Sequence, residues 1–343
     1  MRRYIIIIAL VLILFTGCGK DEIPKLDHNG AKNVDEFDKI EENIPNPEII
    51  KEIAANELGR IMIIEYHVIG DKDARWARSY ESFRQDLEKL YSSGYVAVSL
   101  KDMIKGNIDI PAGKTPVVIT FDDGTQGQFR YIENEQGEMI VDPKSGVGVL
   151  ENFYKEFPDF GLEATFFINY YTPFGQGTEL SKKKITHIIE SGMDIGNHSV
   201  NHLKMNTLSK EEVAKELALI VKMVKDIVPD YEVETLALPF GIGTKETEWS
   251  VRGEYEGTAF ENIGVLLVGS TPAPSPYNKN FPPYALERVQ VFEDNLDKWI
   301  KYFEDNPDQK YVSDGYAEVI SFPESKKEIL NTEIVKEKEI ITY

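Results

Sequence analysis

The chain has 343 residues, of which 42% are hydrophobic and 28% are charged, and its formal net charge is −20 at pH 7. This length and apolar content are sufficient for a substantial core. The excess of acidic residues argues against nucleic acid or an anionic lipid surface as a partner, because both require basic protein surface. The single cysteine, Cys18, excludes an internal disulfide.

The first residues are typical of an export signal. A basic start precedes an apolar run over residues 4–15, and the small residues that follow end at Cys18. The run is shorter than a membrane span and fits the apolar region of a signal peptide. The letters FTGC resemble the bacterial lipobox, in which cleavage occurs before a cysteine that then receives a lipid. We therefore expect a signal peptide over 1–17, membrane attachment through lipidated Cys18 and an extracytoplasmic location. The alternative is an uncleaved anchor with an incidental cysteine.

Two charged segments flank the main part of the chain. Residues 18–56 are broken by three prolines and lack an apolar period, which predicts a charged tether with a short helix near its end. Residues 324–343 are rich in lysine and glutamate and are predicted to be a solvated, charged C-terminal segment. Residues 57–323 remain as one folded domain.

Strand and helix patterns alternate within this domain. Strand-like runs include 61–70, 116–121, 164–169, 193–198, 233–238 and 262–270, and helical periods include 79–93, 149–157, 181–192, 209–228 and 295–303. Nearly continuous apolar strands that alternate with helices indicate a parallel sheet covered by helices. About seven repeats favour a closed or nearly closed barrel over an open sheet. The predicted fold class is therefore α/β, with a distorted (β/α)7-type barrel.

Polar residues gather at three of the predicted strand ends. The sequences TFDDG (120–124), GNHSVNH (196–202) and PFG (239–241) each follow an apolar run, and the carboxyl ends of parallel strands share one rim. His198 and His202 are four residues apart, so we expect them to project from the same face of one helical turn. A carboxylate and two imidazoles suit catalytic Zn²⁺, with a fourth position left for water. A bound cation would also offset the repulsion between the two adjacent aspartates.

The same residues resemble a known family. TFDDG and HSVNH are similar to the first two motifs of the polysaccharide deacetylases, the NodB-homology domain of carbohydrate esterase family 4, and the resemblance extends from about residue 61 to 303. It implies a distorted barrel that hydrolyses N-acetyl groups on a glycan, with 57–323 as the catalytic domain. It further implies that Asp123, His198 and His202 bind Zn²⁺ or another divalent transition metal, and that Asp122 is the general base.

Other site residues are implied with departures from the family pattern. The backbone N–H of Phe240 matches the group that supports the oxyanion, and Ser199 matches a hydroxyl that orients a ligand. The family's third motif has an arginine where this chain has Ala237, and the late histidine that supplies the general acid is absent, since no histidine follows residue 202. Arg288 is our candidate for the missing arginine, as the charge partner of Asp122.

His67 is our candidate for the missing acid. It ends the first predicted strand in EYHVIG, and this resembles the YH strand of deacetylases related to poly-N-acetylglucosamine enzymes, where an early histidine takes that role. The alternative is a buried structural histidine. The long polar segment 125–148 is a candidate substrate lid, or else a plain surface excursion.

The expected function is metal-dependent removal of N-acetyl groups from an N-acetylglucosamine-containing cell-wall or extracellular polysaccharide. Two other functions stay open. One is a catalytically weakened glycan-binding lipoprotein of the envelope, which the missing arginine and histidine favour. The other is an O-acetyl esterase on xylan, which shares the metal chemistry and differs in the leaving group.

Overall fold

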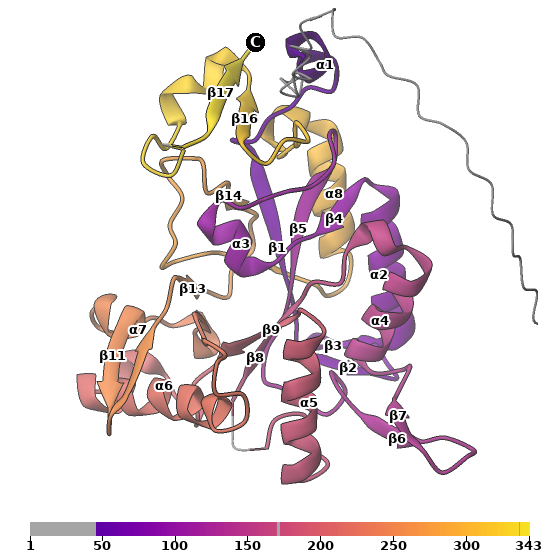
Figure 1. Ribbon diagram of the computed structural model, residues 1–343, viewed down its shortest axis with the longest axis vertical. Coiled ribbons are helices and arrows are strands. Elements are labelled where there is room, and N and C mark those ends of the chain that lie inside the picture. Colours follow the sequence, from indigo (N-terminus) through magenta and orange to yellow (C-terminus); the bar gives the residue numbers. More distant parts are fainter. Residues whose placement is uncertain (1–45, 170–171, 336) are drawn as a thin grey trace, which may run out of the picture. The chain divides into compact units, whose positions relative to one another are not determined.

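A curled, mainly parallel sheet forms the centre of the fold (Figure 1). The structure is a computed structural model that describes residues 46–169, 172–335 and 337–343. The strand order is β13-β10-β9-β8-β5-β1-β14, with β4 paired to β5 and β15 paired to β1. These strands are β1 (Arg60–Tyr66), β4 (Tyr95–Ala97), β5 (Thr115–Phe121), β8 (Thr165–Ile168), β9 (Asp194–Asn197), β10 (Thr235–Ala237), β13 (Gly264–Leu266), β14 (Ala273–Pro274) and β15 (Val289–Gln290). All of the pairings are parallel except that of β14 with β1.

Apolar strands explain why the sheet is buried on both faces. Every residue of β5 is buried, as its run of branched and aromatic side chains requires in a parallel sheet. Along β1 the side chains alternate between two core clusters, with Met62 and Ile64 in one and Ile61 and Ile63 in the other. The prediction of an α/β barrel-type fold is confirmed, in the form of a curled half-barrel with helices.

Helices cover the face of the sheet from which Met62 and Ile64 project. The longer ones are α2 (Tyr80–Ser92), α4 (Gly146–Glu156), α5 (Thr178–Glu190), α6 (Lys210–Lys225) and α8 (Asn295–Asp305), and their apolar residues pack in the cluster of Met62 and Ile64. Helix α6 begins at a capping box, in which Ser209 and Glu212 satisfy each other's backbone N–H groups. The opposite face is covered by α3 (Leu100–Lys105) and by segments after β13.

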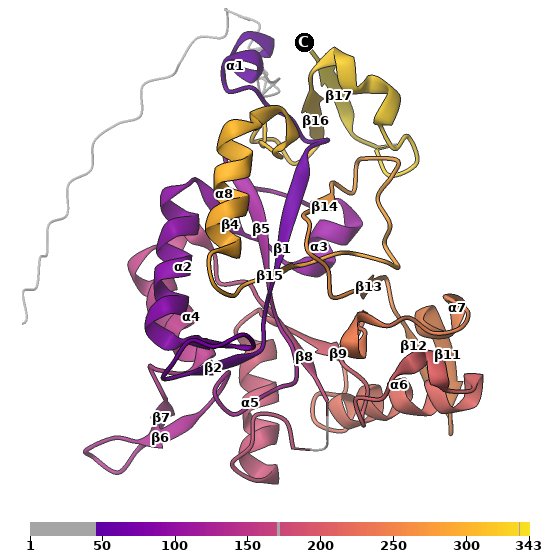
Figure 2. The same ribbon diagram turned by 180° about the vertical axis from the view of Figure 1, so that it is seen from behind.

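The segment 286–290 joins the two ends of the curled sheet. Leu286 pairs with Leu266 of β13 in a parallel bridge, and β15 then pairs in parallel with the end of β1, beside which it lies in Figure 2. The side chain between these two pairings is Arg288. The topology therefore places a charged residue at the seam of the half-barrel, level with the carboxyl end of β1.

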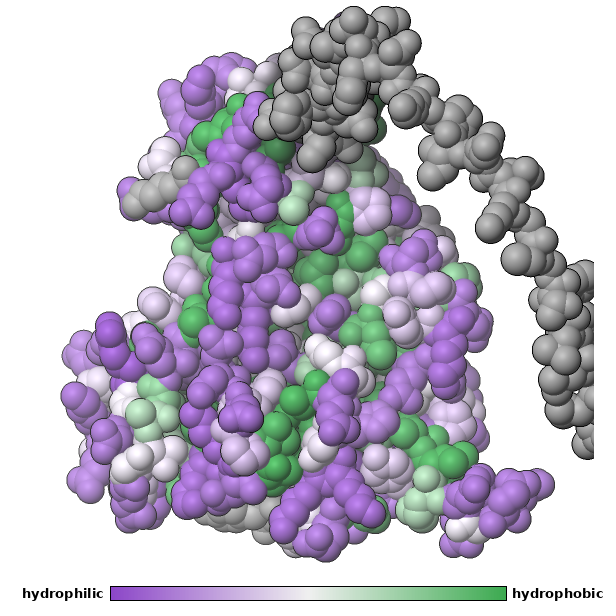
Figure 3. Space-filling model, in the orientation of Figure 1, coloured by the Kyte–Doolittle hydropathy of each residue, from purple (hydrophilic) through white to green (hydrophobic). Residues whose placement is uncertain are grey.

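Short helices and two-stranded pairs, two of them antiparallel hairpins and two of them parallel, surround this sheet. They are α1 (Pro47–Glu52), α7 (Glu248–Val251), the pairs β2 (Val68–Gly70) with β3 (Ala77–Ser79), β6 (Tyr131–Glu133) with β7 (Met139–Val141), β11 (Arg252–Tyr255) with β12 (Thr258–Glu261), and β16 (Val319–Phe322) with β17 (Glu339–Thr342). On the face drawn in Figure 3, hydrophilic side chains predominate and hydrophobic ones lie between them in smaller areas. No helix among the described residues is long and apolar enough to cross a membrane.

The described parts of the two flanking segments agree with the sequence expectation at some positions and differ from it at others. The predicted signal peptide, Cys18 and most of the tether lie outside the described residues, but α1 agrees with the expected short helix, and Ala55 and Asn56 are already buried against the domain. The C-terminal segment is not simply solvated: β17 pairs with β16, and Val335 is buried in the core. The few apolar residues of this charged segment, such as Val335, make the contacts that attach it to the domain.

Candidate active site

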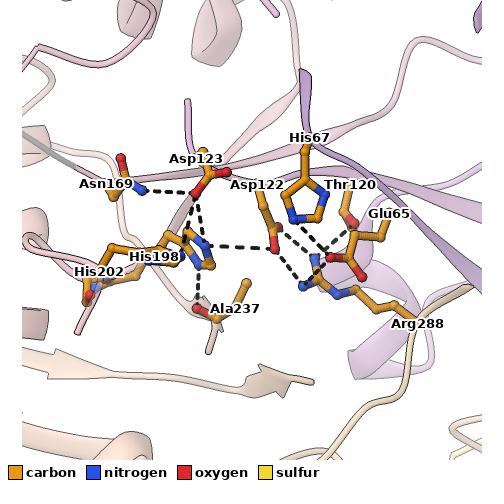
Figure 4. Close-up of polar contacts among 12 residues, drawn as sticks. Glu65, His67, Thr120, Asp122, Asp123, Asn169, His198, His202, Ala237 and Arg288 are labelled. Atoms are coloured by element: carbon orange, nitrogen blue, oxygen red, sulfur yellow. Dashed lines mark hydrogen bonds and ion pairs between the residues drawn. The ribbon is translucent and has the colours of Figure 1, made fainter. Parts of the chain in front are cut away.

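Three side chains from two strand ends converge on one point. Asp123 follows β5, and its Oδ1 lies 3.5 Å from His198 Nε2 and 3.6 Å from His202 Nε2 (Figure 4). One donor atom from each residue lies within 4.8 Å of the other two. His198 Nδ1 contacts the Ala237 carbonyl oxygen at 2.7 Å, which fixes the ring and leaves Nε2 directed at the cluster. A carboxylate oxygen and two imidazole nitrogens in this arrangement fit a divalent transition metal.

The two histidines meet for a reason that differs from the prediction. Residues 198–204 form no helical turn, so the expected shared helix face is wrong. Instead Ser199 and His202 adopt positive φ angles of 58° and 51°, and Asp123 adopts 76°. Such backbone conformations are costly for residues other than glycine and concentrate at functional sites. The loop after β9 is thus bent back so that both rings face the aspartate.

Asp122 lies beside this cluster and is held by a buried arginine. Arg288 Nη1 and Nη2 each donate to a different carboxylate oxygen of Asp122 at 2.7 Å, and both side chains are buried. Burial opposes ionisation of Asp122, but the guanidinium overcomes it and lowers the carboxyl pKa below its ordinary value. Asp122 is therefore an oriented carboxylate at neutral pH, next to the cluster but not part of it.

Arg288, the candidate for the missing arginine, contacts Asp122 from a segment other than the one that contains Ala237. Ala237 ends β10, where its carbonyl serves His198, and the positive charge comes instead from the seam segment 286–290. The Arg288 Nε also donates to the Leu267 carbonyl oxygen at 2.9 Å. Arginine suits this place because its planar fork binds both oxygens of a carboxylate at once.

His67 lies at the edge of the same pocket. The pocket has a volume of about 470 Å³, and it is lined by His67, Val68, Trp76, Asp122, Asp123, His198, His202, Phe240 and Val268. The His67 ring packs against Trp76 with centroids 5.0 Å apart, and its Nε2 lies 3.5 Å from Glu65 Oε1. Burial lowers the pKa of His67 below its ordinary value, and the charge of Asp122 offsets only part of that effect.

Phe240 and Ser199, two further residues of the predicted site, lie close to the histidines. Phe240 has φ of 60° and exposes its ring, which lies 4.6 Å from the His202 ring and forms one wall of the pocket. The role of its backbone N–H stays a prediction. The Ser199 hydroxyl is buried and has no hydrogen-bond partner among the described residues, so the carbonyl of Ala237, not Ser199, orients the first histidine.

Sequence reasoning missed two polar residues of the site. Asn169 follows β8 and donates to Asp123 Oδ1 at 3.1 Å. Glu65 lies within β1 and is buried, 3.5 Å from Arg288 Nη2. Both had a sequence signal, since Asn169 ends the apolar run ATFFIN and Glu65 interrupts the apolar run IMIIEYH. A single charged letter inside a buried strand requires a partner, and the partner was not identifiable from spacing.

The segment 125–148, the candidate substrate lid, contributes no residue to the pocket lining in the described chain. Gln128 is buried and donates to the carbonyl oxygens of His67 and Asp122 at 2.6 and 2.5 Å. The hairpin β6–β7 extends from the domain (Figure 1), and no residue of this segment is among the pocket-lining residues of the described chain. Gln128 therefore links the residues that follow β1 and β5. The β6–β7 hairpin lies at the surface, away from the pocket.

Comparison with known proteins agrees with this geometry. Residues 109–254 match the polysaccharide deacetylase family. The chain shares 23% identity over 243 residues with YxkH of Bacillus subtilis (strain 168), which bears a polysaccharide deacetylase name; the match covers 70% of this chain and 74% of that protein.

Two solved structures have a similar fold. BC0361, a polysaccharide deacetylase from Bacillus cereus, superposes with a TM-score of 0.53 at 16% identity, over 70% of this chain and 69% of that one. The deacetylase PplD of Streptococcus pyogenes, solved with acetate, superposes with a TM-score of 0.51 at 18% identity, over 71% and 97%. At these identities the likeness establishes the fold alone, and the chemistry of this chain has to be argued from its own residues.

Proposed function

We propose that this protein removes N-acetyl groups from an N-acetylglucosamine-containing cell-wall or extracellular polysaccharide and requires a divalent transition metal such as Zn²⁺. The observation that carries the proposal is the convergence of Asp123, His198 and His202 beside an aspartate that a buried arginine holds in place. The family match over residues 109–254 supports the same chemistry.

Each group has a defined task in this proposal. Asp123, His198 and His202 would hold the metal, which when bound supplies Lewis acidity that polarises the acetyl carbonyl and makes water more acidic. Asp122 accepts the proton of the attacking water, and Arg288 keeps its carboxylate ionised and oriented. Trp76 and Phe240 line the pocket with exposed aromatic rings, against which a sugar ring would pack.

The bidentate contact of Arg288 with Asp122 argues for an enzyme over a glycan-binding protein without turnover. The absence of an arginine at position 237 was the main reason to consider a weakened site, and Arg288 supplies an equivalent charge from another segment. A binding protein would gain nothing from an oriented, fully buried carboxylate that points at the cluster.

The test uses the full chain in detergent micelles, loaded with Zn²⁺, against acetylated chito-oligosaccharide, peptidoglycan and acetylated xylan. Free amine and free acetate are measured in parallel. Equal release of amine and acetate from a glucosamine polymer supports the proposal, whereas acetate without amine supports the O-acetyl esterase. Glycan binding without either product supports the binding protein. Chelated protein and Asp122→Asn are the controls.

We further propose that the protein is attached to the outer side of the cytoplasmic membrane through lipidated Cys18. The support is the basic and apolar start of the chain and the position of its only cysteine after that run. Cys18→Ala is expected to move the protein from the detergent-rich to the aqueous phase on phase separation. Equal partition of the two forms would contradict lipidation.

A further inference from the structure

Each aromatic wall of the pocket carries a cation. The Arg75 guanidinium lies over the Trp76 ring, with its carbon 5.2 Å from the ring centroid, and the Lys204 ammonium lies over the Phe240 ring at 5.9 Å. Both distances are within the range of a cation–π contact. Trp76 and Phe240 are 44% and 53% exposed, and Arg75 and Lys204 are exposed as well. The two cations therefore lie at the edge of the pocket, in contact with solvent.

The order of the strands places these two walls on opposite sides of the aspartate–histidine cluster. Phe240 follows β10, the two histidines follow β9, the aspartate follows β5, and Trp76 lies between β2 and β3, which follow β1. In the sheet these strands are arranged β10-β9-β8-β5-β1. The Phe240 ring lies 4.6 Å from the His202 ring, and the Trp76 ring lies 5.0 Å from the His67 ring. A glycan that crosses the pocket with its acetylated sugar at the cluster therefore has its neighbouring sugars beside the two cations.

Neither cation has an acidic partner in the described part of the chain. The interaction of Arg75 and Lys204 with other described residues is limited to the aromatic ring below each of them. Asp73 is the acidic residue closest in sequence to Arg75, but its oxygens accept hydrogen bonds from the Ser79 N–H and the Ser82 hydroxyl, both at 2.7 Å. The positive charge of each side chain is therefore available to a ligand.

The two cations contrast with the charge of the whole protein. The net charge of −20 gives a long-range field that repels anions. The pocket lining of the described chain contains no acidic residue besides Asp122, which Arg288 binds, and Asp123, which belongs to the metal-ligand set. A neutral glycan requires only the aromatic faces of the pocket. An anionic glycan, by contrast, requires positive charge at the pocket to overcome the repulsion.

Resting on the proposed function, we propose that Arg75 and Lys204 determine specificity by recognising an anionic substituent on the sugars that flank the acetylated one. A carboxylate or a phosphate has the charge and the acceptor oxygens that a guanidinium and an ammonium bind. The substrate class is then an acidic glycan that contains N-acetylglucosamine. The same cations repel a free amine, so a neighbouring sugar that has already lost its acetyl group is disfavoured.

The competing explanation is that the two cations only pack on the aromatic rings and hold them in place. Loss of such packing would alter the walls for every glycan, whether charged or neutral. Loss of charge recognition would affect anionic glycans alone, and it would depend on ionic strength. Matched charged and neutral substrates therefore separate the two explanations.

The experiment compares the full chain in detergent micelles, loaded with Zn²⁺, with Arg75→Gln, Lys204→Gln and the double variant. Lys72→Gln is the matched control, because Lys72 is an exposed cation between β2 and β3 without a contact to either aromatic wall in the described chain. The main probe is an N-acetylglucosamine oligosaccharide with a carboxylate on alternate sugars. Its partner is the same oligosaccharide with each carboxylate reduced to an alcohol, and a third oligosaccharide carries phosphate instead. Acetate release gives kcat and KM, and calorimetric titration gives Kd.

The wild type is expected to have a lower KM and Kd for the carboxylate oligosaccharide than for the reduced form. Each single substitution should raise that KM by roughly fivefold, the upper range for an exposed charge pair. The kcat and the bound zinc should not change, because a flanking charge contact is the same in the ground state and the transition state. Arg75→Lys keeps the charge and should keep the preference, whereas 1 M salt, with a Debye length of about 3 Å, should abolish it.

A cationic probe provides the second readout. In a partly deacetylated chito-oligosaccharide, an acetylated sugar lies between sugars with free amines. The wild type should hydrolyse it with a higher KM than the fully acetylated oligosaccharide, and the double variant should reduce that difference. An unchanged difference in the double variant would contradict the repulsion.

Several outcomes overturn the inference. They are equal KM and Kd for the charged and reduced oligosaccharides in the wild type, equal losses on both in the double variant, or an equal effect of Lys72→Gln. A preference for the phosphate oligosaccharide supports anion recognition and identifies phosphate as its source. A wild type that releases no acetate, yet binds the carboxylate form more tightly through these two residues, would refute the proposed function and leave the charge recognition standing. Binding of none of the oligosaccharides would overturn both.

Discussion

Two buried glutamates near the two ends of one strand have opposite surroundings. Glu57 precedes β1, and its two oxygens accept hydrogen bonds at 2.9 Å from the Tyr311 hydroxyl and the Ser321 N–H. Glu65 lies near the carboxyl end of β1, and neither of its oxygens has a partner among the described residues. Their burial is almost the same, at 2% and 1% exposed.

This difference separates a buried carboxylate with a donor for each oxygen from one without such donors among the described residues. At the base of the fold the chain provides a donor for each oxygen of Glu57, and those bonds hold the C-terminal β16 to the start of β1. At the rim the polar groups are turned toward a pocket and toward one another. We therefore expect rim substitutions to change chemistry with little change in fold, and base substitutions to change stability with little change in chemistry.

The largest effect is expected from His202→Ala. The His202 ring is at the rim and only partly buried, so its loss should leave the domain folded while bound zinc falls from about one per chain to near zero and activity to background. Elemental analysis after dialysis measures the zinc. The control is His187→Ala, since His187 pairs with Glu151 on the helical face and lies outside the pocket. Unchanged zinc in His202→Ala would remove the central assignment of the site.

Asp122→Asn should retain zinc and lose turnover by about 10²–10⁴-fold, because asparagine cannot accept the proton of water. It should also destabilise the domain, because the buried Arg288 loses the negative half of a bidentate pair. Asp86→Asn is the matched control: Asp86 is buried and paired with Arg78 at 2.6 and 2.8 Å, away from the pocket. It should share the loss of stability and keep full turnover. Full activity of Asp122→Asn with zinc bound would transfer the role to another residue.

A more selective effect is expected from His67→Ala. Expulsion of an amine needs a proton, whereas an activated aryl acetate departs without one. Acetamide hydrolysis should therefore fall by about 10²-fold while ester hydrolysis, zinc content and the unfolding temperature stay near the wild-type values. Parallel assays on the two substrates provide the ratio. If both rates fall together, or the variant unfolds, His67 is structural and the two ends of β1 are more alike than we infer.

The sequence predicted the rim much better than the seam. The proximity of Asp122, Asp123, His198 and His202 was predictable because strand-end motifs are local in the chain, and the carboxyl ends of parallel strands converge. The fold followed from the alternation of apolar strands and helices for the same reason. The contact between Arg288 and Asp122 joins residues 166 positions apart, and sequence reasoning offered it only as a candidate by resemblance.

Other features of the site and of the C-terminal segment depend on loop conformation and on single contacts, which the spacing of apolar residues does not reveal. The two histidines have helical spacing but meet through left-handed residues in a loop, so their convergence has a different cause from the predicted one. Glu65 and Asn169 were missed because a lone polar letter in an apolar run has many explanations. Burial of Val335 and pairing of β17 were missed because the surrounding lysines and glutamates hide a few apolar contacts.

The smallest effect on activity and the clearest effect on stability are expected from Glu57→Gln. Burial raises the pKa of Glu57 well above its ordinary value, and the nearby Asp314 adds to the shift. A carboxyl whose pKa is raised in the folded state contributes stability that is complete below the unfolded pKa, about 4.5, and is lost as pH rises toward the folded pKa. Unfolding then releases one proton, which lowers the free energy of unfolding by about 1.4 kcal/mol per pH unit.

Glutamine keeps the shape and cannot ionise, so the free energy of unfolding of Glu57→Gln should decline less steeply than that of the wild type between pH 5 and 8. Denaturant titrations at several pH values measure the difference between the two curves. Glu65 also has a raised pKa, but it is present in both proteins and cancels in that difference. Parallel curves would mean that Glu57 ionises in the folded state as it does in the unfolded chain. In that case the hydrogen bonds from Tyr311 and Ser321 stabilise a carboxylate, and the base of β1 holds a buried charge just as the rim does.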